Sequence, residues 1–359
     1  MPKTPRPMPA TPRALGFRMP AEWEPHEATW IAWPHNRDDW PGRFAPIPWV
    51  YAEIVRKLAR VERVRILVQD RAAEDAARRI LRKADANLAA VEFFHAPTDR
   101  GWTRDYCPLF VKNRAGAVAL TNWRFNAWAK YDDWSRDAAI PARLAAALKL
   151  RAWEPGLVLE GGSIDVNGRG LLLTTDECLL SPVQARNPQL SRREIERALG
   201  DYLGVRRVIW LGRGIAGDDT HGHVDDLARF VSRDTVVVAS EADRGDANYA
   251  ALRENLAILG KLPLTVVKLP MPTPLVFNGR RLPASYANFY IANGLVLVPT
   301  FNDPKDRVAL NTLARVFPDR EVTGVNAVEL VWGLGTLHCL TQQQPQSKAG
   351  VGRSADAAR

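Results

Sequence analysis

Short apolar runs alternate with amphipathic segments along most of the 359-residue chain. Apolar runs bounded by turn-forming residues are typical of strands, and apolar residues spaced three and four apart are typical of helices. The runs predict strands at 28–33, 63–68, 108–113, 117–123, 156–166, 170–175, 206–211, 227–239, 264–269, 288–301 and 320–325. The helical spacing predicts helices at 47–61, 71–84, 136–149, 191–203, 246–259 and 305–316. This mixture indicates an α/β fold.

The helix expected at 191–203 illustrates the pattern. Ile195, Leu199 and Tyr202 lie on one stripe, and Ser191 with Glu194 three residues later predicts a capping box at the start. Asn-Gly pairs, which favour tight hairpins, separate strand candidates at 167, 278 and 293. A unit of hairpin and helix therefore recurs about five times, although the copies share little sequence identity.

The two ends differ from the body of the chain. Residues 1–18 are rich in Pro and basic residues, and we expect a disordered leader there and a disordered tail at 346–359. No linker interrupts 19–345, which we expect to form one domain. The N-terminus lacks the apolar region of a secretory signal, and no stretch approaches the ~18 apolar residues of a membrane span. We therefore expect a cytoplasmic protein with no membrane partner.

The chain is basic, with a formal net charge of +9. Its Lys and Arg residues are scattered among Asp and Glu through the body of the chain, and it contains no RRM, zinc-finger or basic-zipper pattern. We therefore expect no nucleic-acid partner, although a non-catalytic nucleic-acid-binding protein remains an alternative class. The three cysteines, Cys107, Cys178 and Cys339, are far apart and form no CxxC pair, which suits a reducing compartment.

Four segments combine polar residues with apolar surroundings: "WTRDYCP" 102–108, "LEGGSIDV" 159–166, "DDTHGHVDD" 218–226 and "GLGTLHCLTQQQP" 333–345. If 218–226 is extended, His221, His223 and Asp225 point to one face. A catalytic zinc ion needs three protein ligands and a water, so this segment raises the alternative of a metal-dependent amidohydrolase using His221 and His223. None of the other four histidines lies in a second ligand motif, which disfavours a metal site.

Cys339 follows a loop containing two glycines, and a thiol there is a candidate nucleophile if a nearby His or cation favours the thiolate. Asp105, Asp225 and Glu160 add carboxylates to the same four segments. Paired carboxylates suit a planar guanidinium, whose N–H groups they accept in bidentate fashion. Trp102 would add a cation–π wall. These residue types together favour a cationic, planar substrate.

The four segments resemble the agmatine deiminase family, which includes bacterial peptidyl-arginine deiminases. The family patterns are matched by "WTRDYCPLFV" 102–111, "EGGSIDVNGRGLLLTTDECLL" 160–180, "GHVDD" 222–226 and "HCLTQQQP" 338–345, and "MPAEWEPHEATWIAWPHN" 19–36 is similar to the family's N-terminal segment. The resemblance covers nearly all of 19–345. The chain departs from the family at four positions: Cys107 replaces a usual Gly, His221 an Asp or Asn, Asp226 an Asn, and Thr336 an Asn.

The resemblance implies a pentein fold, a five-bladed α/β propeller with pseudo-fivefold symmetry. It implies that Cys339 attacks a guanidinium bound by Asp105 and Asp225, that His223 transfers protons, and that Glu160 orients His223. Trp102, Asn288, Trp33 and Asp39 are the further substrate-binding residues that it implies.

The resemblance also implies a hydrolase that needs no metal or cofactor. Agmatine is the leading substrate, giving N-carbamoylputrescine for polyamine synthesis. Peptidyl arginine, free arginine or another guanidine remain alternatives, and association into a homo-oligomer is left open.

Overall fold

The computed structural model describes residues 10–348. Each of five mixed sheets contains an antiparallel pair of strands joined by a parallel strand. In four of them the long helix that leads to the parallel strand comes after the pair in the chain. These units are β5 (Leu109–Asn113), β6 (Val118–Thr121), α6 (Ile140–Leu148), β7 (Ala152–Trp153); β8 (Asp165–Val166), β9 (Leu171–Thr175), α8 (Arg192–Leu203), β10 (Arg207–Leu211); β11 (Ala228–Phe230), β12 (Thr235–Ser240), α9 (Tyr249–Leu259), β13 (Thr265–Pro270); and β16 (Tyr290–Ala292), β17 (Leu295–Thr300), α10 (Lys305–Val316), β18 (Glu321–Asn326).

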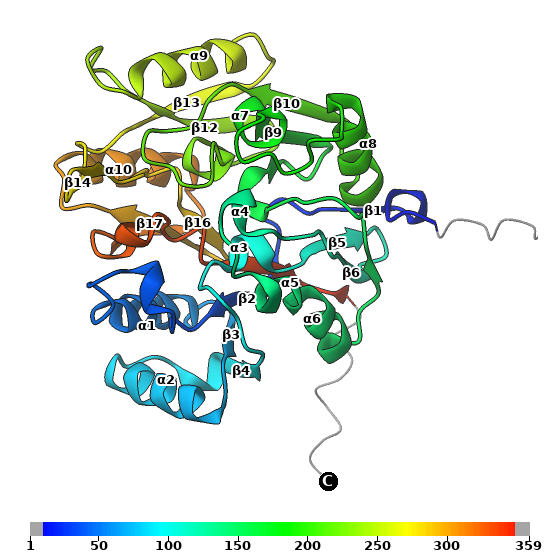
Figure 1. The fold of residues 1–359 in the computed structure, drawn as a ribbon, viewed down its shortest axis with the longest axis vertical. Helices are drawn as coiled ribbons and strands as arrows, with labels where there is room; N and C mark the ends of the chain where they lie inside the picture. Colours follow the sequence, from blue (N-terminus) through cyan, green and yellow to red (C-terminus); the bar gives the residue numbers. More distant parts are fainter. Residues whose placement is uncertain (1–9, 349–359) are drawn as a thin grey trace, which may run out of the picture.

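The fifth sheet joins the two ends of the chain. Strand β19 (Gln342–Pro345) pairs antiparallel with β2 (His26–Ala32). Helix α1 (Ile47–Leu58) leads to the parallel strand β3 (Arg63–Val68), and α2 (Arg71–Lys83) leads to β4 (Val91–His95). Figure 1 shows the longer helices around the outside of the molecule and the sheets between them. The expected α/β class is confirmed.

Short elements connect these units. The hairpin β14 (Val276–Phe277) and β15 (Arg280–Arg281) turns at one of the predicted Asn-Gly pairs. The remaining short elements are α3 (Thr103–Tyr106), α4 (Ala127–Lys130), α5 (Ser135–Ala138), α7 (Asp176–Leu180), and the 3-10 turns η1 (Arg13–Leu15), η2 (Arg37–Asp39), η3 (Leu88–Ala90), η4 (Gly161–Ser163), η5 (Val224–Asp226) and η6 (Leu330–Gly333). Three of these short elements contribute to the candidate site, and η4 packs against both α3 and η5.

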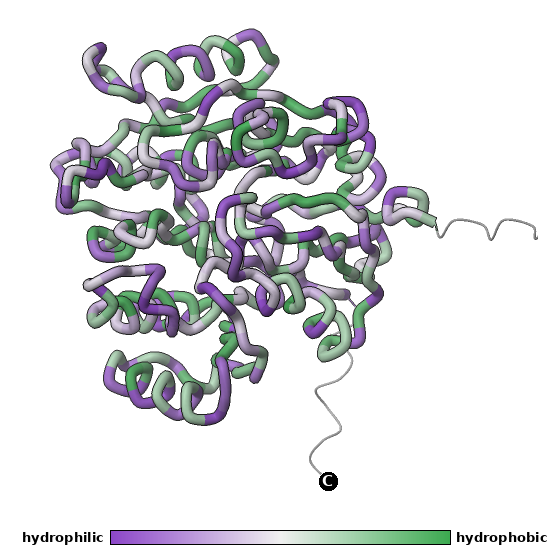
Figure 2. Tube along the Cα trace, in the orientation of Figure 1, coloured by the Kyte–Doolittle hydropathy of each residue, from purple (hydrophilic) through white to green (hydrophobic). Residues whose placement is uncertain are grey.

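The amphipathic patterns explain the long helices. Helix α2 buries Ala77 and Leu81 and exposes Arg71, Arg79 and Arg82, and Figure 2 shows hydrophobic and hydrophilic residues alternating along it. Helix α8 has the predicted capping box between Ser191 and Glu194. Of the predicted stripe, Ile195 and Leu199 are buried and Tyr202 is half-buried.

Some boundaries differ from the sequence-based prediction. The long strand expected at 156–166 is wrong, because the backbone at 161–163 forms η4 and only Asp165–Val166 pair as a strand. The runs 227–239 and 288–301 each contain two strands instead of one. Strand β19 was not predicted, since its three glutamines lack an apolar pattern, yet all three are buried in the sheet.

The N-terminal end of the described residues differs from the expected disordered leader. Residues 10–18 include η1 and the strand β1 (Phe17–Arg18), which pairs with β5, so this part of the expected disordered leader is structured. Residues 1–9 of the leader and 349–359 of the tail lie outside the described residues. Between residues 10 and 348, no helix combines the length and apolar character that a membrane crossing requires. The cytoplasmic location stays a prediction.

Candidate active site

Cys339 lies in the loop between η6 and β19, and Asn288 fixes this loop from behind. The Asn288 side-chain oxygen accepts from the Thr336 hydroxyl at 2.7 Å and from the His338 backbone N–H at 2.9 Å, while its Nδ2 lies 3.1 Å from Cys339 Sγ. Gly335 has no room for a side chain, because a methyl group there would lie 2.8 Å from the Trp102 ring. The thiol is 7% exposed and faces a cavity. Its surroundings therefore hold it at a fixed point.

Asp105 is held by the short helix α3 with both carboxylate oxygens occupied. Oδ1 accepts from the Gly162 backbone N–H at 3.0 Å, and Oδ2 accepts from Trp128 Nε1 at 2.9 Å. Trp128 lies in a left-handed stretch (φ 59°), an unusual conformation for a bulky residue. Burial raises the pKa of Asp105 to about 6, and His223 counteracts this.

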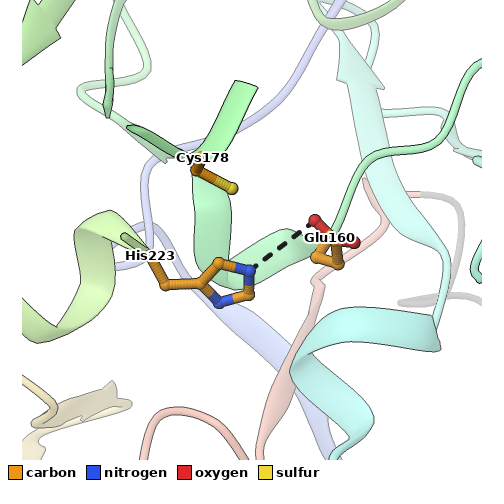
Figure 3. A group of neighbouring side chains, drawn as sticks. All are labelled: Glu160, Cys178 and His223. Carbon is orange, nitrogen blue, oxygen red and sulfur yellow. Dashed lines mark ion pairs between the residues drawn. The ribbon is translucent and has the colours of Figure 1, made fainter. Parts of the chain in front are cut away.

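His223 lies beside two carboxylates without a short hydrogen bond to either. Its Nε2 is 3.6 Å from Glu160 Oε2 and its Nδ1 is 3.8 Å from Asp105 Oδ1, and neither nitrogen has a hydrogen-bond partner among the described residues. Figure 3 shows Glu160 and Cys178 around the ring. Burial lowers the pKa of His223, but Asp105, Cys178 and Glu160 raise it well above its ordinary value. The ring therefore favours the protonated form.

Glu160 is fully buried and remains charged because of Arg186. The Arg186 Nε donates to Glu160 Oε1 at 3.1 Å, and Arg186 also donates to two backbone carbonyl groups. Burial raises the pKa of Glu160, whereas Arg186 and His223 lower it, with a result of about 2. This carboxylate keeps one oxygen, Oε2, without a hydrogen bond on the side that faces His223.

Asp225 completes the site from η5. Its Oδ2 is 2.7 Å from His338 Nδ1 and 3.7 Å from Cys339 Sγ. A methyl group at Gly162 would lie 2.5 Å from His223 Nδ1, 2.9 Å from Asp105 Oδ1 and 3.0 Å from Asp225 Oδ2. Three ionisable groups therefore converge on one point, and only a glycine fits between them.

A cavity of about 240 Å³ leads to Cys339. Its lining combines aromatic and charged side chains and includes Trp102, Trp128, Tyr131, Trp332, Asp38, Asp39, Arg100, Asp219 and Arg280. Apolar walls with a few polar groups are typical of small-molecule sites. A flat cation that entered this cavity would meet aromatic faces on its way to the carboxylates.

The sequence pattern of the Porphyromonas-type peptidyl-arginine deiminase family matches residues 18–345. The chain belongs to this family. The agmatine deiminase of Pseudomonas aeruginosa (strain LESB58) is 40% identical, over 94% of this chain and 97% of that protein.

Two solved structures are also similar. The Enterococcus faecalis agmatine deiminase has a TM-score of 0.89 at 33% identity, with 96% of this chain and all of that one covered. A variant of the C. jejuni agmatine deiminase with substrate bound has a TM-score of 0.85 at 29% identity, with 92% and 97% covered. The expected family and the expected enzyme class, a hydrolase of C–N bonds, are therefore confirmed.

The structure brings most of the predicted residues of this deiminase together. Cys339, His223, Asp105, Asp225 and Glu160 form the buried end of the site, and Trp102 and Asp39 line the cavity. Asp39 is engaged by Arg100 at 2.9 Å. The other predicted substrate contacts lie outside the lining: Asp105 and Asp225 lie against Gly162, Trp33 packs against Tyr51, and Asn288 lies behind the Cys339 loop.

The segment 218–226 is not extended, so the prediction that His221, His223 and Asp225 share one face is wrong. Residues 219–222 form bends, with His221 at a left-handed φ of 64°. The His221 Nε2 lies 3.1 Å from the Ser181 hydroxyl, away from the ring of His223. The two histidines do not converge on one ion site.

Two other groups of described side chains could hold a cation: Glu160 with Cys178 and His223, and Asp225 with Asp226 and Cys339. Arg186 lies against Glu160 in the first group and opposes a cation there. In the second group, burial raises the pKa of Asp226 well above its ordinary value, so this residue favours the neutral acid, which is a poor ligand. Neither group forms a strong metal site.

Sequence reasoning did not assign roles to Glu22, His338, Arg186 and Trp128 in this deiminase site. Glu22 and His338 lie within two of the quoted family segments, so a signal for them was present. Arg186 and Trp128 lie in loops outside those segments, and only the folded chain brings them to Glu160 and Asp105.

Proposed function

We propose that the protein hydrolyses the guanidinium group of agmatine to N-carbamoylputrescine and ammonia, with Cys339 as the nucleophile. The observation that carries this proposal is the convergence of His223, Asp105 and Asp225 around Gly162, next to the Cys339 thiol. The agmatine deiminases named above support the choice of substrate.

Asp105 and Asp225 bind the guanidinium nitrogens and hold the carbon in front of Cys339. Carboxylates bind the planar N–H edges of a guanidinium strongly when water is excluded. Trp102 adds a cation–π contact along the cavity wall. The substrate therefore presents its central carbon to the sulfur in a fixed orientation, which favours attack.

The thiol needs the substrate in order to ionise. Burial raises the pKa of Cys339 well above its ordinary value, and the charges of Asp225, Asp226 and Asp105 raise it further. A bound guanidinium supplies a positive charge among these carboxylates and favours the thiolate. This arrangement keeps the thiol unreactive until a cation of the correct shape occupies the site.

The reaction then proceeds in two halves. The thiolate forms a C–S bond, and the C=N electron pair moves to nitrogen to give a tetrahedral intermediate. His223 donates a proton to one nitrogen, which leaves as ammonia, and an S-alkylthiouronium remains on Cys339. His223, now neutral, takes a proton from water as the water attacks the carbon. The C–S bond then breaks, and the hydroxyl proton that remains on the new oxygen passes to the departing sulfur, which replaces the proton that the thiol released to solvent on ionising. The ureido product is then free, and Glu160 orients His223 throughout.

The cavity lining favours a substrate without a carboxylate. Arg100 and Arg280, the cationic residues in the described lining, are already paired: Arg100 with Asp39 and Asp133, and Arg280 with Asp219. Arg124 is exposed and lies outside the lining. Peptidyl or free arginine would need a cationic clamp for its carboxylate, so agmatine is preferred.

We also propose that the five sheets are the blades of a pseudo-fivefold propeller within a single domain at 19–345. The repeated order of antiparallel pair, helix and parallel strand supports this arrangement. Closing the last sheet with strands from both chain ends would join the first blade to the last.

The test uses the purified protein with agmatine, arginine and a peptide that ends in arginine, each with and without EDTA. Ammonia and ureido product should form fastest from agmatine and should be unaffected by EDTA. Cys339→Ser should abolish turnover while the melting temperature stays close to that of the unaltered protein. Full activity in that variant would refute the mechanism, and loss of activity in EDTA would favour the metal-dependent alternative.

A further inference from the structure

A buried chain of ionisable side chains leads from the nucleophile to the N-terminal segment. Asp225 Oδ2 lies 3.7 Å from Cys339 Sγ and 2.7 Å from His338 Nδ1. On the other side of the imidazole, His338 Nε2 lies 2.8 Å from Glu22 Oε2. All of these side chains are buried. The proposed mechanism uses Cys339 and Asp225 but assigns no role to His338 or Glu22.

His338 lies between two carboxylates, one at each ring nitrogen. An imidazole with one proton can donate to only one of them, and the other nitrogen would then point a lone pair at a carboxylate oxygen. Two protons allow both nitrogens to donate, and each hydrogen bond is then charge-assisted. The distances of 2.7 and 2.8 Å on the two sides therefore indicate a ring that carries a positive charge.

Glu22, the member of this series of side chains that lies farthest from Cys339, is held by several elements of the fold. Glu22 Oε1 accepts from the Ile291 backbone N–H at 2.8 Å. Glu22 Oε2 lies 2.9 Å from an Arg229 nitrogen and 3.3 Å from an Arg104 nitrogen. Both arginines are themselves buried, so Glu22 has little freedom to move. It can therefore hold His338 in one orientation.

Asp225, the member of this series that lies next to Cys339, is where a substrate would bind. Asp105 has donors on both oxygens, from a backbone N–H and from Trp128. Asp225 differs: apart from the Cys339 thiol, His338 is its one hydrogen-bond donor within residues 10–348, and Oδ1 is buried without a partner. A buried carboxylate oxygen without a donor is costly unless a ligand supplies one. His338 thus fixes Oδ2 and leaves Oδ1 for the guanidinium.

We infer that His338 and Glu22 are positioning residues for guanidinium binding, with Glu22 fixing a charged His338 that in turn orients Asp225. The inference rests on the proposed function, because Asp225 is there a guanidinium ligand. His338 and Glu22 do not touch the substrate in this arrangement. They determine which oxygen of Asp225 is available and keep that carboxylate ionised in a site crowded with other acids.

The test compares His338→Asn with His338→Gln. The Asn amide reaches about as far as Nδ1 and can still donate to Asp225, whereas the Gln amide reaches about as far as Nε2 and donates toward Glu22 instead. Loss of a hydrogen bond to a charged group weakens an interaction by about tenfold to a hundredfold. His338→Gln should therefore raise KM about tenfold or more, with a smaller change in kcat, and His338→Asn should stay within about threefold.

Glu22→Gln tests the far end without altering the Cys339 loop, and it should raise KM in the same direction as His338→Gln. His95→Gln is the matched control, because His95 also lies 2.8 Å from a carboxylate, that of Glu74, but on the surface. It should leave KM unchanged. Melting temperatures show whether each variant folds. If His338→Gln does not fold, the KM of Glu22→Gln alone tests the inference.

KM is measured with whichever guanidine of the substrate panel the unaltered enzyme turns over. If agmatine gives no ammonia but another guanidine does, the proposed substrate is wrong, and the variants are compared with that other guanidine. An active enzyme in which Glu22→Gln and His338→Gln leave KM unchanged would overturn the positioning role alone. Equal losses in His338→Asn and His338→Gln would also overturn it, since a purely structural role does not depend on which donor is kept.

Discussion

Two buried histidines lie on opposite sides of the site, and their hydrogen bonding differs. His338 has a carboxylate oxygen within 2.8 Å of each ring nitrogen. His223 has carboxylates at 3.6 and 3.8 Å and no hydrogen-bond partner among the described residues. Both residues are 1% exposed, so burial does not explain the difference.

The difference in hydrogen bonding indicates different roles: one histidine holds a charge, and the other transfers a proton. A ring that donates at both nitrogens is fixed by its partners and cannot release a proton without breaking a charge-assisted hydrogen bond. A ring surrounded by negative charge at a longer distance is favoured in its protonated form and still has nitrogens available for a substrate or water. On the proposed mechanism, His223 transfers protons and His338 does not.

The largest expected effect tests His223 directly. His223→Gln removes the proton donor and should lower kcat by about 10² to 10⁴, because that is the range general acid–base catalysis contributes. KM should change much less than in the His338 variants. Steady-state kinetics of both sets measure this contrast. A His223→Gln enzyme with normal kcat would remove the distinction between the two histidines.

A smaller effect concerns the carboxylates beside them. Burial raises the pKa of Asp105 to about 6, above the ~3.9 of an unfolded chain. Between these values the folded protein binds more protons than the unfolded chain. The stability that Asp105 contributes is therefore present at low pH and lost as pH rises through about 6.

We compare the free energy of unfolding of the unaltered protein with that of Asp105→Asn. The difference between them should fall by about 2 kcal/mol as the pH rises from 4 to 7. Asp225 should show the opposite slope, because burial raises its pKa but His338 and other nearby charges lower it below its ordinary value. Urea unfolding at several pH values measures both. If the free energies of unfolding of the unaltered protein and of Asp105→Asn changed with pH in parallel, the prediction would be contradicted.

The smallest effect is expected at a third histidine, His221. Its ring contacts Ser181 and its backbone is left-handed, a conformation that Asn adopts more readily than most residues. His221→Asn should leave kcat/KM within about twofold and stability within about 0.5 kcal/mol, as for most surface changes. The assay is ammonia release with and without EDTA. A large loss would restore the metal-dependent alternative for this segment.

The sequence was most informative where a function depends on a short segment. Cys339, His223, Asp105 and Glu160 lie in compact motifs, and the helices at 71–83 and 305–316 follow their apolar stripes nearly to the residue. The strand expected at 156–166 fails because its backbone groups bond elsewhere: the Gly162 N–H donates to Asp105 and the Ser163 hydroxyl donates to the Glu160 carbonyl. Tertiary hydrogen bonds therefore replace the strand-to-strand hydrogen bonds that were expected at 156–166.

The rest depends on contacts between distant positions. Glu22 and His338 lie 316 positions apart in the sequence, so no local pattern could indicate that they meet. Strand β19 was missed because its polar residues are buried by specific partners, with Gln344 accepting from Trp30 and from Arg65. The arrangement of the five sheets likewise follows from pairings that no single segment encodes.

The pairing of β19 with β2 has a consequence for the order in which the protein is made. Cys339 comes three residues before β19, and Asp105 and His223 are synthesised long before it. A ribosome must therefore release nearly the whole chain before the thiol meets its partners. A chain that ended before residue 339 would carry Asp105, Asp225 and His223 but would lack the thiol that we propose as the nucleophile.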